Sequence, residues 1–166
     1  IYGVRNPDAL LKGFIMFLNR HSDAKLYFVG TKDLEQKLIE SKNPYLKSIK
    51  FISYTQDLSS IYSRCIGLID INANMDNDVF LSSKVISYLP YNRLIISESG
   101  KGSPVRSIFA KSSTIIHVPH DPMAFFEAME YCYLHKSNID FTERVKYLSS
   151  MNMNAVTDVL IKNIEL

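Results

Sequence analysis

The chain has 166 residues, and its 19 Lys and Arg nearly balance its 17 Asp and Glu, which leaves a formal net charge of +2. A chain of this length buries a core without disulfides or a structural metal, so we expect one domain over residues 1–166. The balanced charge argues against nucleic acid or an anionic membrane as a direct partner. Any anion site must therefore be local. The first residue is not Met, and we expect this domain to be a fragment of a longer protein.

The two cysteines, Cys65 and Cys132, lie in apolar stretches without a second cysteine or histidine at metal-ligand spacing. We interpret them as free thiols. No apolar run approaches the roughly 20 residues that a membrane-spanning helix needs, and no signal-peptide pattern opens the chain. We expect a cytoplasmic location, with the inner face of the membrane reached only indirectly through a full-length protein.

Short apolar, β-branched runs alternate along the chain with longer segments of helical period. This pattern is typical of α/β proteins in which helices cover both faces of a parallel sheet. We predict a single Rossmann-like, doubly wound parallel sheet of about six strands. The expected strands span residues 1–4, 25–29, 49–52, 66–71, 93–97 and 114–118.

Apolar residues recur at helical spacing between these runs. The first helix is expected to begin at Pro7 and Asp8 and to end near His21, and the last helical region to begin at Asp121 and Pro122. Shorter helices are expected near residues 34–39, 58–62, 85–89 and 105–109.

Ligands of open parallel sheets bind beyond the carboxyl ends of the strands, near the point where the strand order reverses. In this sequence, each of these ends is polar or contains glycine. The strand-end segments are Gly3 to Arg5, Gly30 to Thr31, Ser53 to Thr55, Asn72 to Asn74, and Ser97 to Gly102.

A candidate phosphate site lies at Ser82-Ser83-Lys84, immediately before an apolar helical pattern. Backbone N–H groups, hydroxyls and an ammonium group could converge there on one anion. Arg5, directly after the first strand, could contact the same phosphate in a bidentate manner. The alternatives are an ordinary helix cap with a solvated Lys84 and a surface Arg5.

Other site classes find little support in the sequence. Arg5-Asn6-Pro7 follows the first strand where a phosphate-binding loop or a dinucleotide fingerprint would need glycines. Asp76 and Asp78 are better explained as a solvated loop than as a metal site. The histidines have no nucleophile or paired carboxylate at a telling spacing, and we interpret all four as structural or solvated: His21, His117, His120 and His135.

Taken together, these segments resemble the carboxyl-terminal, nucleotide-sugar donor-binding domain of GT-B type glycosyltransferases of bacterial capsule and surface polysaccharide synthesis. The resemblance covers residues 1 to about 130, and Ser83-Lys84-Val85-Ile86-Ser87-Tyr88-Leu89 is its strongest segment. The other matching segments are Tyr2-Gly3-Val4-Arg5-Asn6-Pro7 with Leu10-Leu11, Leu26 to Gly30, Tyr54 through Tyr62, Ile69-Asp70-Ile71-Asn72-Ala73-Asn74, and Asn92-Arg93-Leu94-Ile95-Ile96.

The resemblance implies that this domain binds a UDP-sugar or GDP-sugar, without a metal or a further cofactor, for transfer to a saccharide or lipid-linked acceptor. Arg5 and Lys84 would be the catalytic residues, since they would neutralise the departing diphosphate. An amino-terminal acceptor domain, absent here, would complete the enzyme. The implied binding residues are Gly3, Gly30, Ser53, Tyr54, Thr55, Asn72, Asn74, Ser82, Ser83 and Ser87.

Two positions depart from the family pattern. The glutamate that the family usually has three residues after the lysine is Ser87 here, and the second glutamate position, eight residues earlier than that one, falls on Val79. A serine cannot give the charge-assisted, two-oxygen contact that a carboxylate gives to ribose. The alternative hypothesis is therefore a degenerate, non-catalytic binding or scaffolding module. A response-regulator-like switch is disfavoured because the early strand ends lack clustered aspartates.

Overall fold

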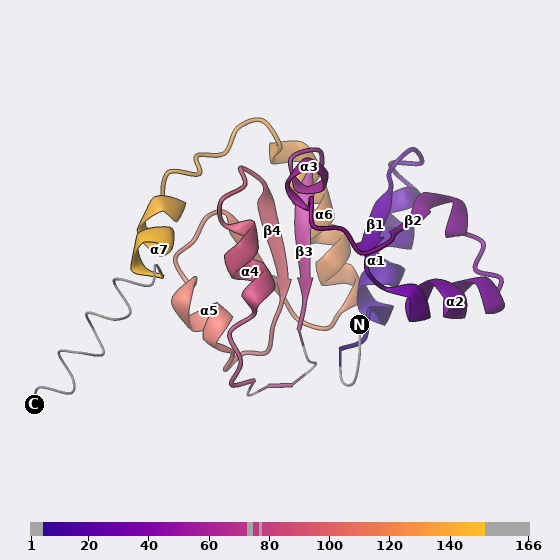
Figure 1. Cartoon of the computed structure of the whole chain (residues 1–166), viewed down its shortest axis with the longest axis horizontal. Helices are drawn as coiled ribbons and strands as arrows, with labels where there is room; N and C mark the ends of the chain where they lie inside the picture. The colour runs from indigo at the N-terminus through magenta and orange to yellow at the C-terminus, as the bar shows by residue number, and fades with distance from the viewer. Residues whose placement is uncertain (1–4, 73–74, 77, 152–166) are drawn as a thin grey trace, which may run out of the picture.

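The computed structural model describes residues 5–72, 75–76 and 78–151. Strands and helices alternate through this part of the chain, as the sequence pattern indicates (Figure 1). The strands are β1 (Leu26–Val29), β2 (Ile49–Ile52), β3 (Gly67–Ile71), β4 (Leu94–Glu98) and β5 (Ile115–Val118). The helices are α1 (Asp8–Leu18), α2 (Lys32–Glu40), the 3-10 turn η1 (Leu46–Ser48), α3 (Ser59–Tyr62), α4 (Ser83–Tyr88), α5 (Pro104–Ile108), α6 (Pro122–His135) and α7 (Arg144–Ser150).

All strand pairs in the described residues are parallel, which confirms the α/β class. β1 pairs with β2, and β3, β4 and β5 form a second sheet in that order. The expected single sheet of about six strands is not what this part of the chain shows: its five strands form sheets of two and three. The sixth expected strand, residues 1–4, lies outside the described residues.

Alternation along each strand divides the core between two faces. Leu94 and Ile96 belong to the cluster that packs under α1 and α6, whereas Leu68 and Ile95 belong to the cluster under α4 and α5. Figure 1 shows α4 and α5 on the near side of β3 and β4, with α6 behind them. The helices on the two faces therefore begin at the same edge, where the strands have their carboxyl ends.

The start of α6 is fixed against α1 by a close approach of the two helices at Gly13. A Cβ atom at this position would lie 2.6 Å from the backbone oxygen of Pro122, closer than a methyl group can approach. Further along, His21 Nε2 lies 2.9 Å from Glu130 Oε1. These contacts show that α1 and α6 run in the same direction, with their first turns at the carboxyl edge.

The buried Arg144 joins α7 to the amino ends of β4 and β5. Its guanidinium donates to the backbone oxygens of Tyr91, Arg93 and Thr114, and its Nε donates to Thr114 Oγ1 over 2.9 Å. Burial lowers the pKa of Arg144 to about 10, against the opposing effect of the neighbouring Glu143 charge. Arg144 thus secures the end of the sheet opposite to the carboxyl edge.

Candidate functional site

Two carboxyl groups are buried at the carboxyl edge of the three-stranded sheet. Asp70 is the fourth residue of β3 and Glu98 the last residue of β4, and their exposed fractions are 0% and 2%. Register pairs Asp70 with Ser97 and Ile71 with Glu98, so the two acidic side chains point to opposite faces. Buried charges on adjacent strands need partners, and the loops that follow supply them.

On the α4 face, Ser82 Oγ donates a 2.8 Å hydrogen bond to Asp70 Oδ1. Within the described part of the chain, Asp70 Oδ2 has no hydrogen-bond partner. Burial raises the pKa of Asp70, while the hydrogen bond from Ser82 and the charges of Lys84 and Arg5 lower it by less. The hydrogen bond from Ser82 holds the first turn of α4, which contains Lys84, beside Asp70.

The sequence predicted Arg5 and Lys84 as an anion-binding pair. Lys84 is exposed in the first turn of α4, and Arg5 is half-buried in the segment that leads into α1. The helices that follow these two residues, α1 and α4, cover opposite faces of the sheet. Ser83, predicted beside Lys84, is also exposed.

Two predicted hydroxyl contacts have other partners in the structure. Ser82 is the N-cap residue of α4 but makes no side-chain cap bond, since its hydroxyl donates to Asp70 instead. Ser87 Oγ donates over 2.8 Å to the backbone oxygen of Lys84, one turn earlier in the same helix. Val79, at the other departure from the family pattern, is 78% exposed. Neither Ser87 nor Val79 provides a carboxylate for ribose.

The remaining predicted residues fall into two groups. Gly30, Ser53, Tyr54 and Thr55 follow β1 and β2, and Gly30 has a φ of 72°, which favours glycine. Asn72 follows β3, is buried, and has no partner for Nδ2 among the described residues. The predicted Gly3 and Asn74 lie outside the described residues.

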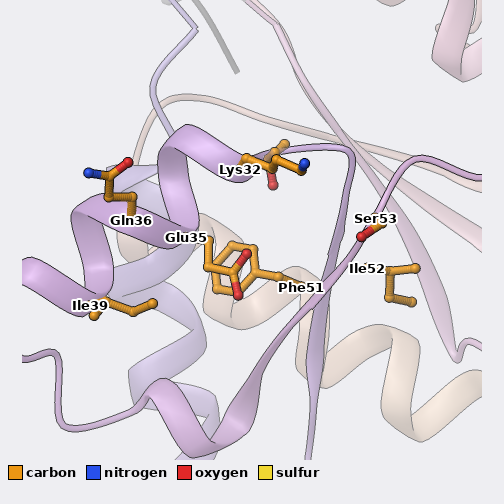
Figure 2. A pocket seen from close by; sticks show the side chains of 8 residues that line it. Lys32, Glu35, Gln36, Ile39, Phe51, Ile52 and Ser53 are labelled. Carbon is orange, nitrogen blue, oxygen red and sulfur yellow. The ribbon is translucent and has the colours of Figure 1, made fainter.

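A pocket of about 360 Å³ opens beside the ends of β1 and β2. Figure 2 shows that α2 forms one wall, and that the end of β2 forms the other. Thr31 Oγ1 is buried there without a partner in the described part of the chain. The volume is within the range of small-ligand pockets. Its lining residues are Thr31, Lys32, Glu35, Gln36, Ile39, Phe51, Ile52 and Ser53.

On the α6 face, His120 Nδ1 contacts Glu98 Oε1 at hydrogen-bond distance or closer. Sequence reasoning missed this pair, because 22 residues separate its members and no motif joins them. It also missed Asp70 as a site residue. The available signal was an acidic residue in or next to an apolar strand pattern. Asp70 lies inside one such run, and Glu98 directly follows another.

The loop after β4 lies against the loop after β3. Gly102 N–H donates to the backbone oxygen of Asp76 over 2.8 Å, and a Cβ atom on Gly100 would lie 1.8 Å from the backbone oxygen of Met75. Arg106 Nε donates to the backbone oxygen of Ser99 over 2.8 Å. Through these contacts, the loops that follow β3 and β4 pack tightly against each other beside Asp70 and Glu98.

The described residues contain no group of three or more His, Cys, Asp or Glu side chains arranged to hold a metal ion. No helix among them is long and apolar enough to cross a membrane.

Known proteins are similar to this chain in fold rather than in sequence. No protein-family model matches the chain, and no curated protein matches it by sequence. The fold is similar to that of a glycosyltransferase from Rickettsia africae ESF-5, with a TM-score of 0.72 and 16% sequence identity. The match covers 99% of this chain but only 44% of that protein, so the chain spans less than half of its length. This likeness shows a glycosyltransferase-like fold.

Proposed function

We propose that this chain is the donor half of a glycosyltransferase, which binds a UDP-sugar or GDP-sugar and stabilises the leaving diphosphate. The observation that carries the proposal is the hydrogen bond from Ser82 to Asp70, which holds the first turn of α4, with Lys84, at the carboxyl edge. Ligands bind at this edge in open parallel sheets. The likeness to a glycosyltransferase over 99% of the chain supports the same reading.

In the proposed reaction, the bond between the anomeric carbon and the diphosphate oxygen breaks, and its electron pair stays on the diphosphate. Arg5 and Lys84 stabilise that growing negative charge, as positioned cations do in other transfer reactions. The acceptor hydroxyl oxygen forms the new bond to the anomeric carbon and loses its proton. The proposal assigns the base that takes this proton, and the acceptor itself, to a second domain outside this chain.

The pocket beside β1 and β2 suits the nucleobase in this proposal. Phe51 supplies an apolar wall, and Ser53 and Thr31 supply hydrogen-bonding groups, of which Thr31 Oγ1 has no partner in the described part of the chain. A base bound there would leave its ribose and diphosphate to extend along the carboxyl edge toward Lys84. Asn72, buried at that edge, is the proposed contact for the donor in place of the glutamates that the family usually has.

Calorimetric titration of the purified chain with UDP, GDP and their sugar conjugates tests the proposal. Replacing Lys84 or Arg5 by Ala should weaken binding of the preferred diphosphate about tenfold each, because each removes one charge-assisted contact to phosphate. Lys111→Ala and Arg64→Ala are matched controls, since both side chains are exposed and lie near the amino ends of the strands. Equal losses in the controls would contradict the proposal.

A non-catalytic binding module is the second candidate. The observation that favours it is that the Ser87 hydroxyl donates to a backbone oxygen of its own helix. Val79, the other position that departs from the family pattern, is exposed. A module of this kind would keep the fold but not bind the donor. The absence of heat from any nucleoside diphosphate at millimolar concentration would favour this candidate, whereas selective binding that depends on Lys84 would exclude it.

A further inference from the structure

The pair of Glu98 and His120 is a second charged arrangement at the carboxyl edge. Glu98 keeps 3% of its side chain exposed and His120 keeps 22%. Because a carboxylate only accepts hydrogen bonds, the proton between them belongs to His120 Nδ1. The contact therefore fixes the ring orientation through Nδ1, so Nε2 is the nitrogen that a ligand could reach on this partly exposed side chain.

Burial of this pair costs more free energy than a purely structural contact would justify. Within the described part of the chain, the other carboxylate oxygen, Glu98 Oε2, is buried without a partner. Burial raises the pKa of Glu98, the bond and charge of His120 lower it, and the charge of Asp70 raises it again. A buried carboxylate next to a second one destabilises the fold unless cations compensate. Such an arrangement is common where a histidine must be oriented for work at its other nitrogen.

The segments that hold His120 and Arg5 lead into two helices on the same face of the sheet. His120 directly precedes the N-cap residue of α6, and Arg5 precedes α1. The close approach of α1 and α6 at Gly13 holds these two segments in a fixed relation. An anion over the ends of β3 and β4 would thus have Lys84, in α4, on one face of the sheet and His120, before α6, on the other.

We propose that His120 Nε2 binds a phosphate oxygen of the nucleoside diphosphate, and that Glu98 is the positioning residue that holds the imidazole for this contact. This inference rests on the proposed function and deepens it. An imidazole that holds a proton on each nitrogen has two donors, and in this proposal one goes to Glu98 and the other to the ligand. The charged groups near it are Glu98 from β4, whose carboxyl group also experiences the charge of Asp70 from β3, and the exposed Asp121, which is next in sequence.

The test compares a nucleoside diphosphate with the matching nucleoside, using UDP with uridine and GDP with guanosine. His120→Ala should weaken binding of the preferred diphosphate about tenfold and change nucleoside binding less than about twofold. His120→Gln, whose amide retains a donor, should restore part of the loss. His135→Ala, at the last residue of α6, is the matched control and should change neither affinity.

A double-mutant cycle separates positioning from simple stabilisation. Glu98→Ala alone should weaken diphosphate binding, but it should add nothing in a His120→Ala background, because Glu98 acts through the imidazole. Thermal unfolding of each variant checks that the fold survives.

Three outcomes would overturn the inference. Wild-type affinity in His120→Ala would remove the phosphate contact while leaving the proposed function standing. Parallel losses of nucleoside and diphosphate binding, together with a lower melting temperature, would assign the pair a structural role only. Failure of the wild-type chain to bind any diphosphate would remove both this inference and the proposed function.

Discussion

Replacing Arg144 by Ala should destabilise the domain by removing the guanidinium that joins α7 to the ends of β4 and β5. Three backbone oxygens, those of Tyr91, Arg93 and Thr114, would lose a charged donor. The hydrogen bond from Arg144 Nε to Thr114 Oγ1 would also be lost. A buried acceptor left without a partner costs about 1–3 kcal/mol. The burial cost of the guanidinium itself disappears with the side chain and offsets part of that loss. We expect a net destabilisation of about 3–5 kcal/mol, because several buried acceptors lose their donor at once.

Urea unfolding followed by circular dichroism measures this loss directly. For a chain of this length, about 3–5 kcal/mol corresponds to a fall in melting temperature of roughly 10 °C. Arg144→Lys should lose about half as much free energy, since an ammonium keeps the charge but not the planar set of donors. Lys146→Ala, an exposed residue of the same helix, should stay within about 0.5 kcal/mol of wild type. A change below about 1 kcal/mol in Arg144→Ala would refute the reasoning.

Three further substitutions test the core and the edge. Because burial raises the pKa of Asp70, the folded state binds its proton more tightly, and that stability is lost as pH rises through the raised pKa. Asp70→Asn should therefore gain stability over wild type at pH 7 and gain less at pH 3.5 in urea titrations; an equal difference at both pH values would contradict this. Gly13→Ala should lower the free energy of unfolding by about 1–3 kcal/mol, because its Cβ would meet the backbone oxygen of Pro122; an unchanged midpoint would contradict the close packing. Gly100→Ala should weaken diphosphate binding, since its Cβ would displace the backbone at Met75 beside the carboxyl edge; unchanged affinity would show that this loop does not form part of the site.

Much of the fold follows from local sequence pattern. The expected strand at residues 49–52 is confirmed at both ends, and the other described strands begin and end within a residue of the expected positions. The reason is that buried parallel strands are short runs of β-branched and apolar residues, which the sequence marks clearly. β4 runs one residue further than expected, to Glu98, because an acidic residue at a strand end does not read as buried.

The candidate site was only partly predictable. Arg5 and Lys84 were predicted from their positions after a strand and before a helix, and their role as an anion-binding pair stays a prediction. The buried acidic residues and His120 were not, because their proximity depends on strand register and on helix packing rather than on spacing in the sequence. Ser82 shows the same limit: a serine before a helix predicts a cap, but its hydroxyl bonds to Asp70 instead.

Mapping backbone amide signals of the isotope-labelled chain during a titration with UDP and GDP tests the central claim most directly. We expect saturable shifts for one nucleotide that cluster at the carboxyl edge, around Arg5, Lys84, Gly100 and His120, together with Ser53 at the pocket. Shifts that appear elsewhere, or no shifts at millimolar nucleotide, would contradict the assignment of this edge as a donor site.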